Sequence, residues 1–202
     1  MGVGRDKMIW AFEQSRKYTS GSLYRAITFG GVRDQQLMNV WKCNIPLKVK
    51  NFIWMAAHDR IQSGIQLKKK KWSGPEECAA CDSLETTDHI LFQCPLAVYL
   101  WSFLRVSLGW SASPTNCTDF LLEFAEDCRG AKRKVTLFIC AGALWTIWKT
   151  RNDMAIKKKI VSSPKVIIFK TLMLIKTWRP LLKAKLDSTA EEMINLLDTN
   201  MQ

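Results

Sequence analysis

Four residues of the kinds that bind metals lie close together in the sequence, in the pattern C-x2-C-x7-H-x4-C. They are Cys78, Cys81, His89 and Cys94. This spacing suits one tetrahedral zinc ion, because two thiolates can bind from one tight turn while the histidine and the last cysteine are separated by about one helical turn. A catalytic zinc normally keeps three protein ligands and one position open for water. A closed set of three sulfurs and one nitrogen therefore predicts a structural Zn²⁺ site.

A Cys-x-x-Cys redox pair, or a set of thiols scattered through the core, is the alternative interpretation of the same cysteines. A redox pair would explain Cys78 and Cys81, but it would not explain where His89 and Cys94 stand. The zinc interpretation accounts for all four residues and is therefore favoured.

The remaining cysteines and the second histidine are expected to be structural. His58 lies on a predicted helix and is expected to be a partly buried imidazole rather than a ligand. Single cysteines among apolar residues usually behave as small hydrophobic side chains. Those of this chain are Cys43, Cys117, Cys128 and Cys140.

The composition indicates a globular protein with a polyanionic partner. The chain has 202 residues, 48% of them hydrophobic, and a formal net charge of +12 with a pI near 9.5. A basic balance of this size favours nucleic acid, with an anionic membrane surface as the weaker alternative. The excess of positive charge is concentrated in one region, because residues 149–185 hold eleven Lys or Arg residues and the single acid Asp153.

The N-terminal residues lack the apolar run and cleavage site of a signal peptide. The longest uncharged stretch, 135–148, is shorter than the ~20 residues that a membrane span needs, and we expect it to be a buried helix. An odd number of cysteines without a signal indicates a reducing compartment. We therefore expect a nuclear or cytoplasmic protein with no transmembrane segment.

The pattern of apolar residues predicts a mostly α fold: a helical domain with a small N-terminal β-hairpin and one structural zinc site, followed by C-terminal helices. The hairpin strands are expected at 8–12 and 17–19, before a short helix that Ser20 caps and that Gly30 and Gly31 end. Further helices are expected at 46–67, at His89 after a Thr86 or Thr87 cap, at 95–104, from Thr118 to a stop at Gly130, at 135–153, at 164–178 and after Ser188.

Several short motifs occur in a specific order along the first half of the chain. Their residues are Trp10, the element Ser22, Leu23, Tyr24, then Val40, Trp41, Lys42, Ile45, Pro46, Lys48, Lys50, Phe52, Trp54, Leu67, Trp72, the four proposed zinc ligands with Glu85 and Thr86 among them, Pro95 and Trp101. In this order the segment resembles the zinc-binding domain that follows the reverse transcriptase of plant LINE-type retroelements. Beyond it, Leu144, Trp145, Trp148, Lys149, Arg151 and Asn152 are similar to the helix that usually follows.

The resemblance implies a zinc-binding domain over residues 1–108 and a basic helical region over 109–202. In such elements the polymerase carries paired aspartates and a ribonuclease H-like domain often follows, but this chain has no Asp-Asp pair. Two-metal nucleotidyl transfer needs converging carboxylates. We therefore expect a truncated relic that lacks the polymerase and ribonuclease H domains, is not an enzyme, and has no small-molecule substrate.

Two functions follow from these features. The first is binding of RNA or single-stranded DNA, in which lysines and the later basic helices touch phosphates and an indole stacks on an unpaired base. The residues expected to carry it are Lys48, Lys50, Lys68, Lys69, Lys70, Lys71 and Trp72. Against this stands the commoner role of a lysine run as a solvated turn and of Trp72 as a core residue.

The second function is that of a domesticated protein-interaction module, a regulator or adaptor with no nucleic-acid role. Nine tryptophans and the apolar stretches 166–169 and 172–175 motivate it, since exposed apolar patches often mark partners. The alternative is that Trp145, Trp148 and Trp178 pack the two C-terminal helices against each other. Association of Lys157, Lys158 and Lys159 with an anionic membrane is a third, less favoured interpretation.

Overall fold

The structure of this chain is a computed structural model that describes residues 9–11, 13–23, 35–124, 130–159 and 161–201. The chain divides into two compact units, Met1–Asp34 and Gln35–Gln202, of which the second contains most of the protein. Tyr24, Ile27, Gly30, Gly31 and Cys128 lie outside the described residues, so the expectations for them stay predictions.

The N-terminal β-hairpin is a wrong prediction, because the described residues of the first unit form no strand. They form a turn in which the Trp10 N–H donates to the carbonyl of Arg16 (3.0 Å), and the Trp10 ring meets Tyr18 edge to face at 5.1 Å. The helix that follows includes residues 20–23. Its cap is Thr19 rather than Ser20, since the Thr19 hydroxyl accepts from the Ser22 N–H while Ser22 Oγ accepts from the Thr19 N–H.

The second unit consists of helices joined by loops, and its described residues hold no strand beyond an isolated bridge between Glu77 and Leu84. In chain order its elements are α2 (Gln35–Lys42), α3 (Leu47–Ala57), α4 (Gly64–Lys69), η1 (His89–Gln93), α5 (Pro95–Leu108), α6 (Cys117–Asp119), η2 (Phe120–Phe124), α7 (Gly130–Ala155), α8 (Lys165–Trp178), η3 (Arg179–Leu181), η4 (Ala184–Leu186) and α9 (Asp187–Met201). The mostly α fold is confirmed.

Three prolines start helices where the sequence predicts it. Pro46 immediately precedes α3, Pro95 is the first residue of α5, and Pro164 immediately precedes α8. Proline suits these positions because its fixed φ fits a first turn and its missing N–H has no partner to lose there. The single helix expected over 46–67 is instead two, α3 and α4, because the chain turns at Asp59, whose φ is +50°.

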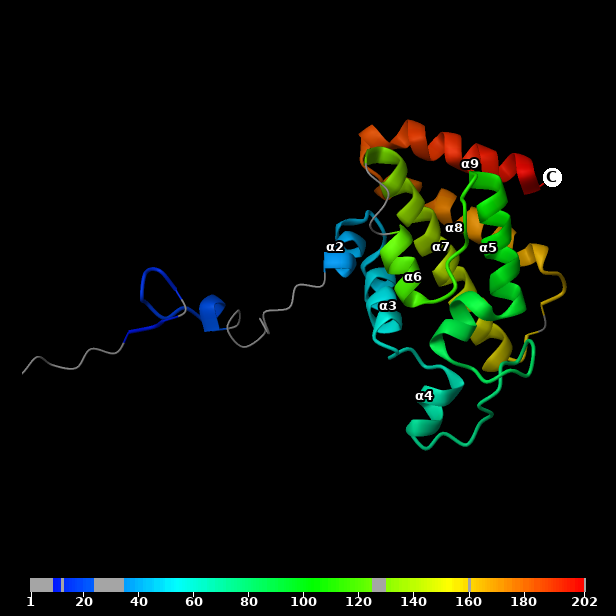
Figure 1. The fold of residues 1–202 in the computed structure, drawn as a ribbon, viewed down its shortest axis with the longest axis horizontal. Coiled ribbons are helices and arrows are strands. Elements are labelled where there is room, and N and C mark those ends of the chain that lie inside the picture. The colour runs from blue at the N-terminus through cyan, green and yellow to red at the C-terminus, as the bar shows by residue number, and fades with distance from the viewer. Residues whose placement is uncertain (1–8, 12, 24–34, 125–129, 160, 202) are drawn as a thin grey trace, which may run out of the picture. The chain divides into compact units, whose positions relative to one another are not determined.

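Helix α7 is the centre of the second unit. It contacts α3, α5, α8 and α9, and α8 lies along it (Figure 1). Every residue from Val135 to Leu144 is buried, so the helix has no solvent face over this stretch. A helix that is hydrophobic all round belongs in a core, which confirms the buried helix expected over 135–148. Gly130 is the first described residue of α7, with φ +85°, and whether it closes the preceding helix lies outside the described residues and stays a prediction.

Residues on both sides of position 108 share one hydrophobic core. Phe52 of α3 stacks on Trp148 at 5.6 Å and meets Trp145 edge to face at 5.4 Å. These two tryptophans therefore pack α7 against α3. The boundary expected near residue 108, between the zinc-binding domain and the basic helical region, stays a prediction. None of the helices in the described part of the chain combines the length and the hydropathy that crossing a bilayer requires.

Helices α7 and α8 approach each other closely at Gly142. A Cβ added there would lie 2.5 Å from Cγ2 of Ile175, which is itself fully buried. We therefore expect Gly142→Ala to lower the free energy of unfolding by about 1 to 3 kcal/mol, because overpacking forces the two helices apart. Urea unfolding measures this. The double variant Gly142→Ala/Ile175→Ala removes the clashing methyl, so its destabilisation should be smaller than the sum of the single effects. Additive effects would contradict the close contact.

Candidate metal centre

The first two candidate ligands lie in a tight turn between residues 76 and 85. Its two arms are held by hydrogen bonds from the Cys78 N–H to Ser83 O (2.8 Å) and from the Glu85 N–H to Glu76 O (2.9 Å). Inside the turn the Cys81 and Asp82 N–H groups both donate to the carbonyl of Cys78, and Asp82 has φ +57°. An aspartate tolerates this left-handed conformation better than most residues. The turn therefore directs both thiols of the Cys-x-x-Cys pair to one side.

His89 and Cys94 lie at the two ends of η1, a single π-helical turn. The His89 N–H donates to Thr86 Oγ1 at 2.9 Å, which confirms Thr86 as the cap expected there. The Cys94 N–H donates to the carbonyl of His89 at 2.7 Å, and Cys94 is the N-cap residue of α5. Trp101 holds η1 from the next helix, because its Nε1–H donates to Leu91 O at 2.8 Å.

The structure brings the four candidate ligand atoms to within 4.8 Å of one another. Cys78 Sγ and Cys94 Sγ are 3.8 Å apart, and Cys81 Sγ is 3.3 Å from His89 Nε2. Two sulfurs bound to one tetrahedral zinc at ~2.3 Å each are about 3.8 Å apart, and a sulfur and a nitrogen about 3.5 Å. These four atoms therefore fit a Zn²⁺ site of three thiolates and one imidazole.

The surroundings favour a charged thiolate at Cys94. Its hydrogen bond with the Cys78 thiol lowers the pKa of Cys94, and the N–H of Leu96 in the first turn of α5 lowers it further, against the effect of burial. The same sulfur contact, together with burial, raises the pKa of Cys78. A metal ligand must be deprotonated, so the lowered pKa of Cys94 favours metal binding through this thiol.

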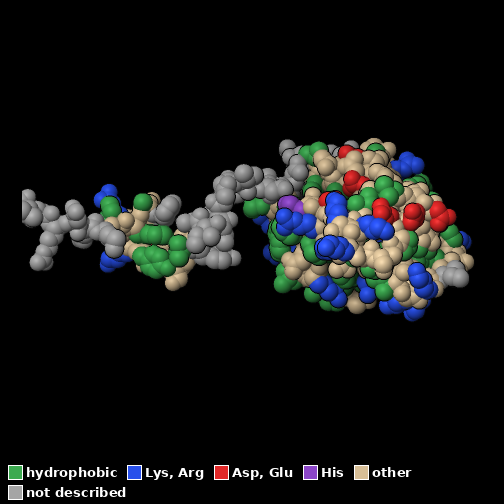
Figure 2. All heavy atoms as spheres, turned by 90° about the horizontal axis from the view of Figure 1, so that it is seen from below, with side chains coloured by type: hydrophobic (Ala, Val, Ile, Leu, Met, Phe, Trp, Pro, Cys, Tyr) green, Lys and Arg blue, Asp and Glu red, His purple; other side chains and the backbone are tan. Residues whose placement is uncertain are grey.

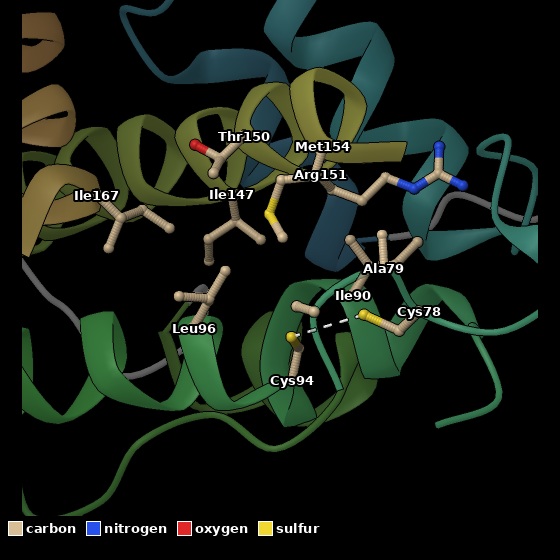
Figure 3. A pocket seen from close by; sticks show the side chains of 11 residues that line it. Cys78, Ala79, Ile90, Cys94, Leu96, Ile147, Thr150, Arg151, Met154 and Ile167 are labelled. Atoms are coloured by element: carbon tan, nitrogen blue, oxygen red, sulfur yellow. Dashed lines mark hydrogen bonds between the residues drawn. The ribbon is translucent and has the colours of Figure 1, made fainter. Parts of the chain in front are cut away.

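A small cavity lies beside the cluster, among side chains from α5, α7 and α8 (Figure 3). Its volume is about 20 Å³, which is room for about one water molecule. Cys78 and Cys94 face each other at its edge, and its wall is mostly apolar, with Ile147, Met154 and Ile167. These apolar side chains shield the sulfurs from solvent on the side of α7.

Residues 18–101 match the protein family described as zinc-binding in reverse transcriptase. The match covers less than half of the chain, and within it the segment is similar to this family. The resemblance stated from the motifs is therefore confirmed over the part of the chain that holds the four candidate ligands.

The chain is also similar to an Arabidopsis thaliana protein that is provisionally named a ribonuclease H protein. The two are 24% identical over 155 residues, which is 73% of this chain and 25% of that protein. The chain thus spans a quarter of the length of that relative. No solved structure matches the chain.

A buried ion pair ties the zinc-binding domain to α7. Glu85 accepts hydrogen bonds from Arg151 Nε at 3.0 Å and from Arg151 Nη2, and it also accepts from the Gly64 N–H at the start of α4 (2.8 Å). The Arg151 guanidinium lies over the Trp148 ring, 5.5 Å from its centroid. Both residues stand among the family motifs, but 66 positions separate them and no spacing rule pairs them. Sequence reasoning missed this pair.

The lysines expected to touch phosphates lie at two places around the zinc-binding domain. Lys48 is exposed at the start of α3, with Nζ 5.7 Å from the centroid of Trp145, and Lys50 donates to the carbonyl of Trp41 at 2.7 Å. The run 68–71 ends α4, beyond the other end of α3. The structure therefore does not gather these lysines into one site.

Trp72 and His58 are more exposed than their expected structural roles suggest. Trp72 is 38% exposed, and its ring covers Gly74, where an added Cβ would lie 2.1 Å from it. His58 is exposed, and its Nδ1 is 2.8 Å from the carbonyl of Trp54. The partly buried imidazole expected at His58 is therefore wrong. Cys43 and Cys140 are buried, as expected of small hydrophobic side chains, and Cys117 is half-buried.

We expect Arg151→Met to destabilise the zinc-binding domain by about 3 to 5 kcal/mol, because it leaves the Glu85 carboxylate buried without its partner. Urea unfolding of the full chain measures the effect. The double variant Glu85→Gln/Arg151→Met removes both charges and should be less destabilised than the sum of the single changes.

A matched control is Lys157→Met, which removes a cation from an exposed pair with Asp153 and should change stability by less than about 1 kcal/mol. Equal effects of the two methionine substitutions would contradict the role assigned to the buried pair.

Proposed function

We propose that this chain is a non-catalytic zinc-binding module of retroelement origin that binds RNA or single-stranded DNA. The observation that supports the metal is the cluster of Cys78, Cys81, His89 and Cys94, whose donor atoms lie within 4.8 Å of one another. These four residues would hold Zn²⁺ as a structural ion. A set of four protein ligands leaves no position for a reacting water, which supports a scaffolding role.

Support for nucleic acid as the partner comes from charge. Lys and Arg side chains are spread across the face of the second unit on the side of α4, with some Asp and Glu among them (Figure 2). We assign phosphate contacts to Lys48, Lys50 and the run 68–71, and a stacking contact to the half-exposed Trp72. Contacts of this kind recognise the sugar-phosphate backbone and unpaired bases rather than a sequence.

The second candidate function is that of a protein-interaction module, and α8 supplies its motivation. Of the apolar stretches that suggested it, Ile167, Ile168, Leu172 and Ile175 are buried in the core. Phe169 and Met173 remain, 54% and 50% exposed on one face of α8. A partner held by these residues through apolar burial should stay bound in a high-salt pull-down that releases polyanions. Loss of every partner at high salt would count against this candidate.

Zinc content tests the metal assignment. We expect about one zinc per purified chain by elemental analysis, and loss of that zinc together with a lower melting temperature in Cys81→Ala, because structural zinc contributes folding free energy directly. Cys117→Ala is the matched control, since Cys117 is also a partly buried thiol but lies outside the cluster, and it should keep its zinc. A chain without zinc, or a Cys81→Ala variant that keeps it, would show that the assignment is mistaken.

Salt dependence tests the nucleic-acid function. We expect the affinity for a labelled single-stranded oligonucleotide, measured by fluorescence anisotropy, to fall as salt rises. The slope of log affinity against log salt should be about −0.7 for each phosphate contact, because binding releases counterions. No binding at low salt, or binding that does not change with salt, would rule out the proposed mechanism.

A further inference from the structure

The connection between α7 and α8, the whole of α8 and the short turns after it lack acidic residues. No Asp or Glu occurs in residues 154–186, between Asp153 and Asp187. The cations of this stretch are Lys157, Lys158, Lys159, Lys165, Lys170, Lys176, Arg179, Lys183 and Lys185. The phosphate contacts assigned above use none of them, so this strongly basic part of the chain is still without a role.

The fold brings the end of α7 beside the first turns of α8. Met154 and Ile167 line the same small cavity, and Gly142, further back in α7, lies against Ile175, further along α8. The two helices are thus antiparallel, and the lysine-rich connection between them lies at the edge of the second unit (Figure 1). Lysines of the connection and of the start of α8 therefore lie at the same end of this helix pair.

Asp153 lies at the centre of a cluster of these lysines. Lys157 Nζ is 2.8 Å from Asp153 Oδ1, and the Lys159 N–H donates to the carbonyl of Asp153 at 2.9 Å. The hydrogen bond from Lys157 lowers the pKa of the Asp153 carboxyl, and the charges of Lys170 and Lys159 lower it further, against the effect of burial. Three lysines from the connection and from α8 therefore face one carboxylate.

The positive charge of this cluster is not balanced. Asp153 can neutralise only one of the three lysines. Lys158, Lys159, Lys165 and Lys170 are exposed and take part in none of the ion pairs among the described residues. Like charges held close together repel one another unless an anion lies between them. We give the name α7–α8 basic patch to Lys157, Lys158, Lys159, Lys165 and Lys170.

An exposed aromatic ring adjoins the α7–α8 basic patch. Phe169 follows Lys165 by about one helical turn and directly precedes Lys170, and all three side chains are exposed on α8. More than half of the Phe169 side chain is open to solvent, at 54%. Proteins bind single strands with basic surfaces that carry exposed aromatic rings, with phosphates on the cations and bases on the rings.

A lipid surface fits the α7–α8 basic patch less well than a nucleic acid does. A helix that binds in the membrane interface buries its apolar face among the lipids. The apolar face of α8 is already buried in the core, through Ile167, Ile168, Leu172 and Ile175. Among the described residues of the connection and α8, the large apolar side chains left exposed are Ile156, Phe169 and Met173. Three apolar side chains beside five lysines favour a polyanion in water.

We propose that the α7–α8 basic patch binds backbone phosphates of single-stranded RNA or DNA and that Phe169 stacks on a base between them. This inference rests on the proposed nucleic-acid function. It adds to that function a contact site at the end of the α7–α8 pair, built from cations that the fold gathers around Asp153.

The test uses the zinc-loaded full chain and two labelled probes of about 12 nucleotides, oligouridylate and oligodeoxythymidylate. The patch variant Lys159→Gln/Lys170→Gln removes two exposed charges and breaks no ion pair of the described residues. The matched control Lys183→Gln/Lys185→Gln removes two exposed lysines that lie after the other end of α8. Melting temperatures verify that each variant is folded, and affinities are measured over a salt series.

We expect the patch variant to bind more weakly and the magnitude of its salt slope to fall by about 1.4, that is, about 0.7 for each lost phosphate contact, while the control keeps the wild-type slope. Phe169→Leu should weaken binding by about 5- to 150-fold, the range for one base stack, without changing the slope, because it removes no charge.

If wild type binds and the patch variant keeps the wild-type slope, or the control loses as much slope as the patch variant, the α7–α8 basic patch is not the site although the proposed function stands. If wild type binds neither probe, both the proposed function and this inference fail. A Phe169→Leu variant that binds both probes as tightly as wild type would overturn the stacking role of Phe169.

Sedimentation with vesicles of phosphatidylcholine and phosphatidylserine tests the lipid alternative on the same proteins. We expect wild type and the patch variant to sediment with the vesicles to the same extent. Sedimentation of wild type that the patch variant loses, together with unchanged oligonucleotide binding in that variant, would show that the patch binds lipid phosphates instead of nucleic acid.

Discussion

The buried ion pair between Glu85 and Arg151 is the interaction on which the arrangement of the second unit depends. Glu85 lies at the end of the Cys-x-x-Cys turn and also accepts the Gly64 N–H, so one carboxylate joins α4, the turn and α7. Arg151 in turn lies over Trp148, and Trp148 stacks on Phe52 of α3. A continuous series of contacts therefore runs from the zinc-binding residues to α3. Separating these elements would leave a buried charge without its partner, which costs free energy, so we expect α4, the turn and α7 to unfold together.

The ion pair and the candidate zinc site stabilise the same loop from different directions. Within the loop, the four donor atoms converge from the 76–85 turn and from the two ends of η1. Outside it, Glu85 binds Arg151 and Asp88 Oδ1 accepts the Cys117 N–H at 2.9 Å. A loop held in this way positions the thiols before any ion binds, so less conformational entropy is lost on binding than in a free peptide.

Whether a feature of the fold or of the site could be predicted depends on how far apart in the sequence the interacting residues lie. The donor set could be read because its spacing is local, and the helices at Pro46, Pro95 and Pro164 because proline acts on its own turn. The same local reasoning placed a hairpin at the N-terminus, where Thr19 and Ser22 cap a helix instead. The Glu85–Arg151 pair and the partner of Trp148 could not be read, because both depend on which helices pack together.

The distribution of basic residues shows that predicting functional sites from the sequence has the same limit. In the sequence the run 68–71 is the most conspicuous basic feature, yet Lys68 lies beside Glu76, and a run of exposed lysines loses side-chain entropy whenever it is ordered by a ligand. Lys42 is far along the chain from the neighbouring residues Arg133 and Lys134, and helix packing brings all three to one cleft. Which cations lie together is therefore decided by the packing of the helices and not by runs in the sequence.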